Sequence, residues 1–393
     1  MKYGFFVKGT AGVLLAVAGM GCGKEEVITQ QVEENAEESA RFISLEEVAS
    51  LLSTLPLEAE QVQEVWDATL SSAGNGYDEE YRMQDLFHTP GSGVGSGGET
   101  RASSYKRPLR ELLRSAAKAR FSTKADGEED PEAWLDSLAA SDVQIYWPGP
   151  DSWNGKELPV ITYDPGDGAE RNEGYELLPD GSVRKIMVDE QMSLERPVWV
   201  VNRNSDAEYK SLELLRREDP SWGNGGGDIV VSKASDGIQT LVLRSFKAHR
   251  QYDSWFAGAS EFWVKCGSVE NFKATSEDEL QLYKPSITDF MIVVRRNQVG
   301  EELPFNAVLV SEWTSGLESM ALMMIEDDGG TRTTWKANAT VKYNSKSYGI
   351  DVEFPLNTRD DIVWRGSLSH QYIRKYSGQS VRFGDVELVL ELL

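Results

Sequence analysis

Cysteine is nearly absent from this chain, which has two cysteines and three histidines in 393 residues. Two cysteines exclude a disulfide framework and a cysteine-rich zinc domain, and three histidines leave little room for a histidine-based metal site. Basic residues are also scarce, because 40 Lys and Arg stand against 64 Asp and Glu for a formal charge of -24. This balance excludes nucleic acid as a general partner, since such binders need a basic face to displace counterions.

Catalytic motifs are missing as well. The sequence has no P-loop, no dinucleotide-binding glycine motif, no HExxH zinc helix and no GxSxG nucleophile elbow. His88, His249 and His370 are isolated from one another along the chain. A glycosidase needs a pair of carboxylates, but among 64 acids such a pair can always be nominated. The sequence therefore leaves an enzyme undecided and favours a protein without catalytic residues.

The first 21 residues are typical of a secretory signal. Lys2 and Lys8 precede an apolar run over residues 10–20, and that run is shorter than the roughly 20 apolar residues that span a bilayer. It ends in Gly19-Met20-Gly21-Cys22, which resembles a bacterial lipobox. The resemblance implies a lipid on Cys22 and hence a membrane partner through that anchor. Cleavage after Ala16-Val17-Ala18, an A-x-A-like site, is the alternative.

The segment after Cys22 carries a second resemblance. Gly23-Lys24-Glu25-Glu26 resembles the surface-export signal of lipoproteins in Bacteroidota, and it implies an outer-membrane protein that faces the cell surface. A plain acidic spacer is the alternative. Residues 22–40 carry six glutamates and no aromatic residue, so they predict a disordered, self-repelling tether. The chain as a whole looks like the uncharacterised surface lipoproteins of that phylum.

Helical patterns follow the tether. Residues 41–90 predict a helical hairpin module, with a capping box at Ser44 and Glu47, a second helix that opens at Pro56, and a third helix over Tyr77–Phe87. Residues 91–104 predict a Gly/Ser linker.

Residues 105–140 predict a basic amphipathic helix, followed by a helix that Asp130-Pro131 opens. The basic helix suits an anionic membrane or an acidic partner. The acidic residues 126–136 offer it a partner within the chain, and the overall acidity favours this internal pairing.

From residue 141 the apolar period changes to two, which indicates strands. Residues 141–218 predict a small antiparallel β-hairpin unit and residues 228–393 an antiparallel β-sandwich. The clearest strand runs from Thr333 to Tyr343, where every second residue is less polar than its neighbours. Cys266 lies in an apolar strand and predicts a buried small hydrophobe. The expected fold class is therefore α+β and mostly β.

The C-terminal part is similar in layout to a C2-type sandwich. The residues that carry this resemblance are strand 240–247, loop 248–260, strand 261–265 and the stretch from Phe354 to Leu368. In calcium-binding members of that family, acids in two such loops hold the ion. The resemblance therefore implies calcium ligands at Asp253, Asp360 and Asp361, although Asp-Gly turns in β proteins are mostly plain turn chemistry. Apart from calcium, no cofactor is expected.

Tryptophan is abundant, with eleven residues. Trp153, Trp222 and Trp255 lie in turn-like segments, where an exposed indole can contact a sugar face or anchor a peptide. The alternative is that these indoles plug the edges of a core. We therefore expect a surface-anchored, non-enzymatic binding module for a glycan or protein. An extracytoplasmic hydrolase with a site between the two β parts and a fimbrial or envelope structural subunit are the alternatives.

Overall fold

The computed structural model describes residues 43–88, 105–122, 130–166, 168–178, 180–204, 209–219, 237–328 and 330–393. The predicted signal, Cys22, the predicted tether, the predicted Gly/Ser linker and Trp222 lie outside these residues. Among the described residues, 41% are in strands and 27% in helices, and most of the strand pairs are antiparallel. The expected mostly-β class is thus confirmed.

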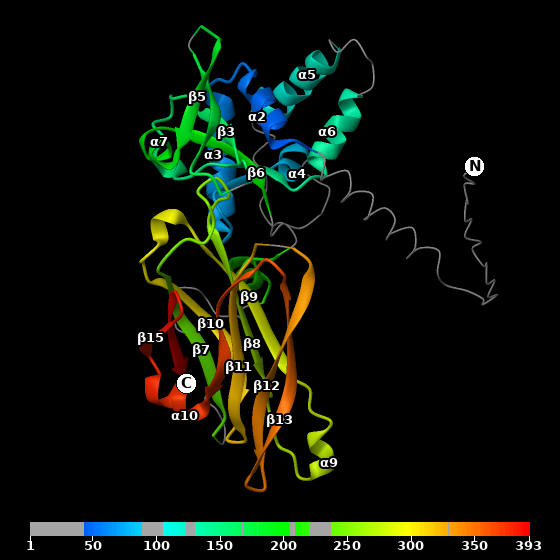
Figure 1. Ribbon diagram of the computed structural model, residues 1–393, viewed down its shortest axis with the longest axis vertical. Coiled ribbons are helices and arrows are strands. Elements are labelled where there is room, and N and C mark those ends of the chain that lie inside the picture. Colours follow the sequence, from blue (N-terminus) through cyan, green and yellow to red (C-terminus); the bar gives the residue numbers. More distant parts are fainter. Residues whose placement is uncertain are drawn as a thin grey trace, which may run out of the picture.

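Two units lie end to end along the long axis of the molecule (Figure 1). The N-terminal unit, residues 43–204, contains helices α2 (Leu45–Ser53), α3 (Ala59–Gly74), α4 (Met83–Phe87), α5 (Leu109–Ser122), α6 (Pro131–Ala139) and α7 (Glu190–Glu195). Its strands are β1 (Glu80–Arg82), β2 (Val143–Tyr146), β3 (Val160–Tyr163), β4 (Arg171–Leu177), β5 (Val183–Asp189) and β6 (Val198–Arg203).

The C-terminal unit, residues 209–393, is built mainly from strands. They are β7 (Gln239–Ala248), β8 (Ser260–Ser268), β9 (Ser286–Val294), β10 (Leu303–Trp313), β11 (Leu317–Glu326), β12 (Arg332–Tyr343), β13 (Lys346–Asn357), β14 (Asp361–Ser369), β15 (Gln379–Phe383) and β16 (Val386–Leu392). Its short helices are α8 (Leu212–Glu218), α9 (Glu277–Leu280) and α10 (His370–Tyr376).

Local sequence signals explain most helix starts. The Ser44 hydroxyl accepts from the Glu47 amide at the start of α2, and the Asp130 carboxylate accepts from the Glu132 amide at the start of α6, as predicted. The prediction that Pro56 opens the next helix is wrong. Helix α3 begins three residues later, behind a Glu58 cap whose amide donates to Gln61 Oε1 over 2.9 Å.

The basic helix α5 pairs within the chain, as the overall acidity favoured. Lys118 lies 2.7 Å from Glu132 of α6, and Arg120 lies 3.1 Å from Glu47 of α2. These pairs are partly exposed, so solvent screening leaves each with only a small contribution to stability. They place α5 beside α2 and α6, on the outside of the N-terminal unit (Figure 1).

The helices and the first sheet share one core, in which Val48 and Leu52 of α2 pack with Ile161 and Trp199 of the sheet. The sheet order is β1-β2-β6-β3-β4-β5. Strands β3 and β6 run parallel, so the expected purely antiparallel unit is corrected to a mixed sheet. The reason is the connection between these strands. The β4–β5 hairpin and α7 lie between β3 and β6 in the chain, so the chain can cross over and place β6 beside β3 in the same direction.

The segment predicted as a third helix, Tyr77–Phe87, is also corrected. Its middle forms β1, in which Tyr81 lies opposite Ile145 of β2, and α4 takes up the remainder. Tyr81 is buried. Burial of its side chain at the sheet edge favours a strand here, and a local sequence pattern contains no information about that burial.

Two antiparallel sheets make up the C-terminal unit, with orders β10-β7-β16-β15 and β13-β12-β11-β8-β9, and β14 also pairs with β11. Strand β12 covers the predicted strand over 333–343. Asn344 and Ser345, with φ of 47° and 65°, turn it into β13, which is the left-handed pair that a two-residue hairpin requires.

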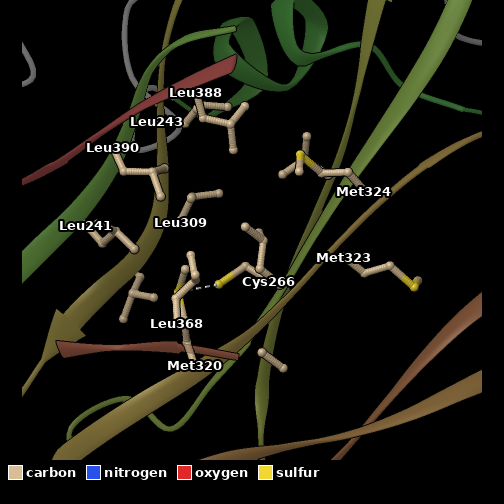
Figure 2. Packing of buried hydrophobic residues seen from close by; sticks show 14 of the residues in the cluster. Leu241, Leu243, Cys266, Leu309, Met320, Met323, Met324, Leu368, Leu388 and Leu390 are labelled. Carbon is tan, nitrogen blue, oxygen red and sulfur yellow. Dashed lines mark hydrogen bonds between the residues drawn. The ribbon is translucent and has the colours of Figure 1, made fainter. Parts of the chain in front are cut away.

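Both C-terminal sheets contribute to a single core (Figure 2). Cys266 of β8 lies inside it, fully buried, with its sulfur 3.3 Å from that of Met320. Burial raises the pKa of the Cys266 thiol, so the thiolate is disfavoured. The prediction that Cys266 is a buried small hydrophobe is confirmed.

Candidate functional site

The loop between β7 and β8 joins the two units. Trp255 and Phe256 are 3% and 0% exposed, and their ring centroids lie 4.0 Å apart with the planes tilted by 32°. Both rings pack against Tyr146, Val188 and Val200 of the first sheet. The Trp255 indole donates to the Glu170 carbonyl over 3.1 Å. The loop therefore belongs structurally to the N-terminal unit as much as to its own strands.

Polar contacts reinforce this joint. Asp78 of the N-terminal unit accepts from the Ala259 amide over 2.9 Å. Gly258 has φ of 127°, and a Cβ there would lie 2.6 Å from the Asp78 carboxylate, so the approach requires glycine. Arg296 of the C-terminal unit pairs with Glu190 of α7 at 2.6 Å. The acids described next lie at this joint.

Three carboxylates converge beside the loop. They belong to Asp253 of the loop, Glu261 at the start of β8 and Glu326 at the end of β11, and one oxygen from each lies within 4.8 Å of the others. We call these residues the junction triad. Glu326 lies opposite Phe262 of β8 and opposite Asp361 of β14. Because opposite residues in an antiparallel ladder share a face, Glu326 follows the fully buried Phe262 inward.

Burial dominates the electrostatics of the triad. Glu326 is 0% exposed, and neither of its carboxylate oxygens receives a hydrogen bond from the described residues. Burial raises the pKa of Glu326 strongly, and the facing Asp253 carboxylate raises it further. Burial also raises the pKa of Asp253, and a hydrogen bond with the Glu326 carboxyl group partly offsets this rise.

The acidic turns beside the triad have different roles. Asp360 Oδ2 accepts from the Asn357 amide over 2.6 Å, which is ordinary turn chemistry. Burial raises the pKa of Asp360 to about 6. Asp361 lies across the ladder from Glu326 and raises its pKa through charge repulsion. Of the three sequence-predicted calcium ligands, Asp253 is thus in the triad, Asp361 borders it and Asp360 closes a turn.

Sequence reasoning missed Glu261 and Glu326. Both residues lie in strands, where an acidic residue is normally interpreted as part of the solvent-exposed face. The available signal was the position of Glu326, which ends the apolar run Met323-Met324-Ile325 and is directly followed by two more acids. An acid that continues a buried run is costly unless it has a partner.

The arrangement has the donor chemistry of a hard-cation site. It offers carboxylate oxygens without nitrogen or sulfur, which suits Ca²⁺, Mg²⁺ or Mn²⁺. Two oxygens on opposite sides of Ca²⁺, each at about 2.3–2.6 Å, lie roughly 5 Å apart. The 4.8 Å limit within the triad is therefore compatible with one shared ion.

The structure does not bring the predicted platform residues Trp153 and Trp255 together. Trp255 lies in the joint between the units, and Trp222 is outside the described residues. Trp153 is half-buried and lies 6.5 Å from the equally half-buried Trp66, with their ring planes tilted by 46°. Their indole nitrogens donate to the carbonyls of Glu157 and Pro150, each over 2.9 Å. The rings are therefore held in place while part of each remains exposed.

No family model, curated protein or solved structure matches this chain. Within the described residues, no helix is both long and apolar enough to cross a membrane.

Proposed function

We propose that this protein is an outer-membrane lipoprotein, anchored at the cell surface through Cys22, that binds a glycan without catalysing a reaction. The acidic segment 22–40 acts as its tether. The C-terminal unit forms a β-sandwich with a C2-like layout, and the two sheets that share one core support this reading. A protein ligand at the same surface is the alternative outcome of the binding test below.

The observation that carries the proposal is the corner formed by Trp66 and Trp153. Each indole is oriented by a backbone carbonyl, and Trp147 packs edge-on beneath Trp153 at 5.8 Å. The exposed turn next to Trp153 presents Asn154, with Glu157 half-buried beside it. Fixed indoles beside amide and carboxylate groups provide both stacking and hydrogen bonding for a sugar ring.

A hydrolase with a site between the two β parts is the second candidate, because acids do converge there. The junction triad includes Glu326, however, whose carboxylate is fully buried, and a general acid must come within hydrogen-bond reach of its substrate. His249 is paired with Glu387 at 2.8 Å and His370 stacks on Trp313. These placements favour binding over hydrolysis.

A fimbrial or envelope subunit is the third candidate. Such a subunit donates or accepts an edge strand. The last strand of this chain, β16, lies between β7 and β15 and is paired on both sides. This pairing gives the C-terminal strand little freedom to be donated.

A glycan array probed with the purified full chain tests the proposal. We expect retention of a defined glycan class and loss of affinity by about tenfold or more in Trp153→Ala and Trp66→Ala, since a packed aromatic anchor typically carries over 1 kcal/mol. Trp335→Ala, a half-buried indole of β12 in the other unit, is the matched control and should bind normally. Absence of glycan binding, or turnover of the bound glycan, would contradict the proposal.

A further inference from the structure

One feature of the junction triad stands apart from glycan binding. Glu326 is fully buried and none of the described residues donates a hydrogen bond to either oxygen. A buried carboxylate in this position costs several kcal/mol unless a proton or a cation meets it. Its carboxylate points toward those of Asp253 and Glu261, within 4.8 Å, so the missing partner would face all three.

The surrounding charges do not supply that partner. Arg296 is directed to Glu190 at 2.6 Å and to the backbone carbonyl of Asp253 at 3.3 Å. The neighbours that act on Glu326 through charge are Asp253, Asp328 and Asp361, and all three are acidic. Their repulsion therefore adds to the cost of its buried negative charge.

We propose that Asp253, Glu261 and Glu326 together bind one Ca²⁺ ion. Carboxylate oxygens are the ligands that Ca²⁺ prefers, and its flexible coordination accepts a set drawn from a loop and two strands. Mg²⁺ requires near-ideal octahedral geometry and retains several waters, which a site that includes a fully buried carboxylate suits less well. Asp361, opposite Glu326 on β14, borders the site.

The ion would fix the loop that joins the two units. Asp253 lies two residues before Trp255, whose ring is buried against the N-terminal sheet. Glu261 and Glu326 belong to paired strands of the C-terminal unit. A cation shared by the loop and the strands ties the Trp255 segment to the C-terminal framework, so that binding stabilises the joint. This inference does not depend on the glycan proposal.

Calcium titration of the metal-stripped full chain tests the site. We expect binding heat by calorimetry, and a rise of about 5 °C or more in the unfolding midpoint at saturating Ca²⁺. Hydrogen exchange of residues 250–259 should slow when Ca²⁺ binds. Glu326→Gln should abolish all three effects. In chelator this variant should be at least as stable as the original chain, because the amide can donate to the Asp253 carboxylate.

Asp351→Asn, an exposed acid on β13, is the matched control and should bind Ca²⁺ like the original chain. Two results would overturn the proposal. One is that Ca²⁺ leaves heat and midpoint unchanged in the original chain. The other is that Glu326→Gln retains the original affinity, which would place the ion at other acids. Binding without slower exchange in residues 250–259 would overturn the role of the ion at the joint.

Discussion

Several acidic side chains of the N-terminal unit are buried. Glu64 of α3 is 3% exposed, and its Oε2 accepts from the Leu109 amide at the start of α5 over 2.7 Å. Burial raises the pKa of Glu64 to about 7, and burial likewise raises the pKa of Glu79 to about 7. These acids lie outside the junction triad, and their titration is expected to make the N-terminal unit sensitive to pH.

Glu64→Gln tests this sensitivity. The folded-state pKa of about 7 lies above the ordinary value of 4.5, so the folded chain holds the proton more tightly than the unfolded chain. The stability that this proton contributes is complete below pH 4.5 and is lost as the pH rises through 7. We expect the variant to equal the original chain at pH 4.5 and to exceed it at pH 8 by about 1–3 kcal/mol, since one pKa unit is about 1.4 kcal/mol.

Urea unfolding at the two pH values measures the difference. Glu111→Gln, at an exposed position of α5, is the control and should leave the pH profile unchanged. Equal stability of Glu64→Gln and the original chain at pH 8 would show that the ionised carboxylate is tolerated at this position.

Among the elements, the helix caps were predictable because a cap involves residues within one turn. The Asp130 carboxylate accepts from the Glu132 amide over 3.0 Å. The strand β1 was not predictable, because its pairing with β2 joins Tyr81 to Ile145 across a long stretch of sequence. Local patterns describe a helix end well and a strand edge poorly, since the strand depends on its neighbour.

Asp130→Ala should destabilise α6 by about 1 kcal/mol, the usual cost of losing an N-cap. Asp130→Asn should recover most of that loss. Lys118→Met removes the 2.7 Å pair with Glu132 and should cost less stability than the loss of the cap, because the pair is exposed to solvent. Chemical denaturation that ranks the ion pair above the cap would refute this ordering.

For the whole molecule, the decisive feature is how the two units are joined. The contact rests on Trp255 and Phe256 in the N-terminal sheet and on Asp78 at the Ala259 amide. Since this joint is both apolar and hydrogen-bonded, we expect the two units to unfold in one transition.

Trp255→Ala should uncouple the units, because truncating a buried tryptophan typically costs about 3–5 kcal/mol. Differential scanning calorimetry should show one transition for the original chain and two for the variant. Trp364→Ala, at a half-buried position of β14, should retain one transition. A single unshifted transition in Trp255→Ala would show that the loop contributes little to the joint.

The sequence by itself determined the mostly-β class, two of the helix caps, the burial of Cys266 and the internal pairing of the basic helix. These features depend on residues close in sequence or on the overall balance of charge and apolar area. It is also the sole basis for the proposal of a lipid anchor at Cys22, which lies outside the described residues. The tertiary structure decided where Trp255 is buried, that β3 and β6 run parallel, and that Asp253 meets Glu261 and Glu326. These contacts join residues far apart in the chain, and only the packing of the sheets determines which of the 64 acids become neighbours.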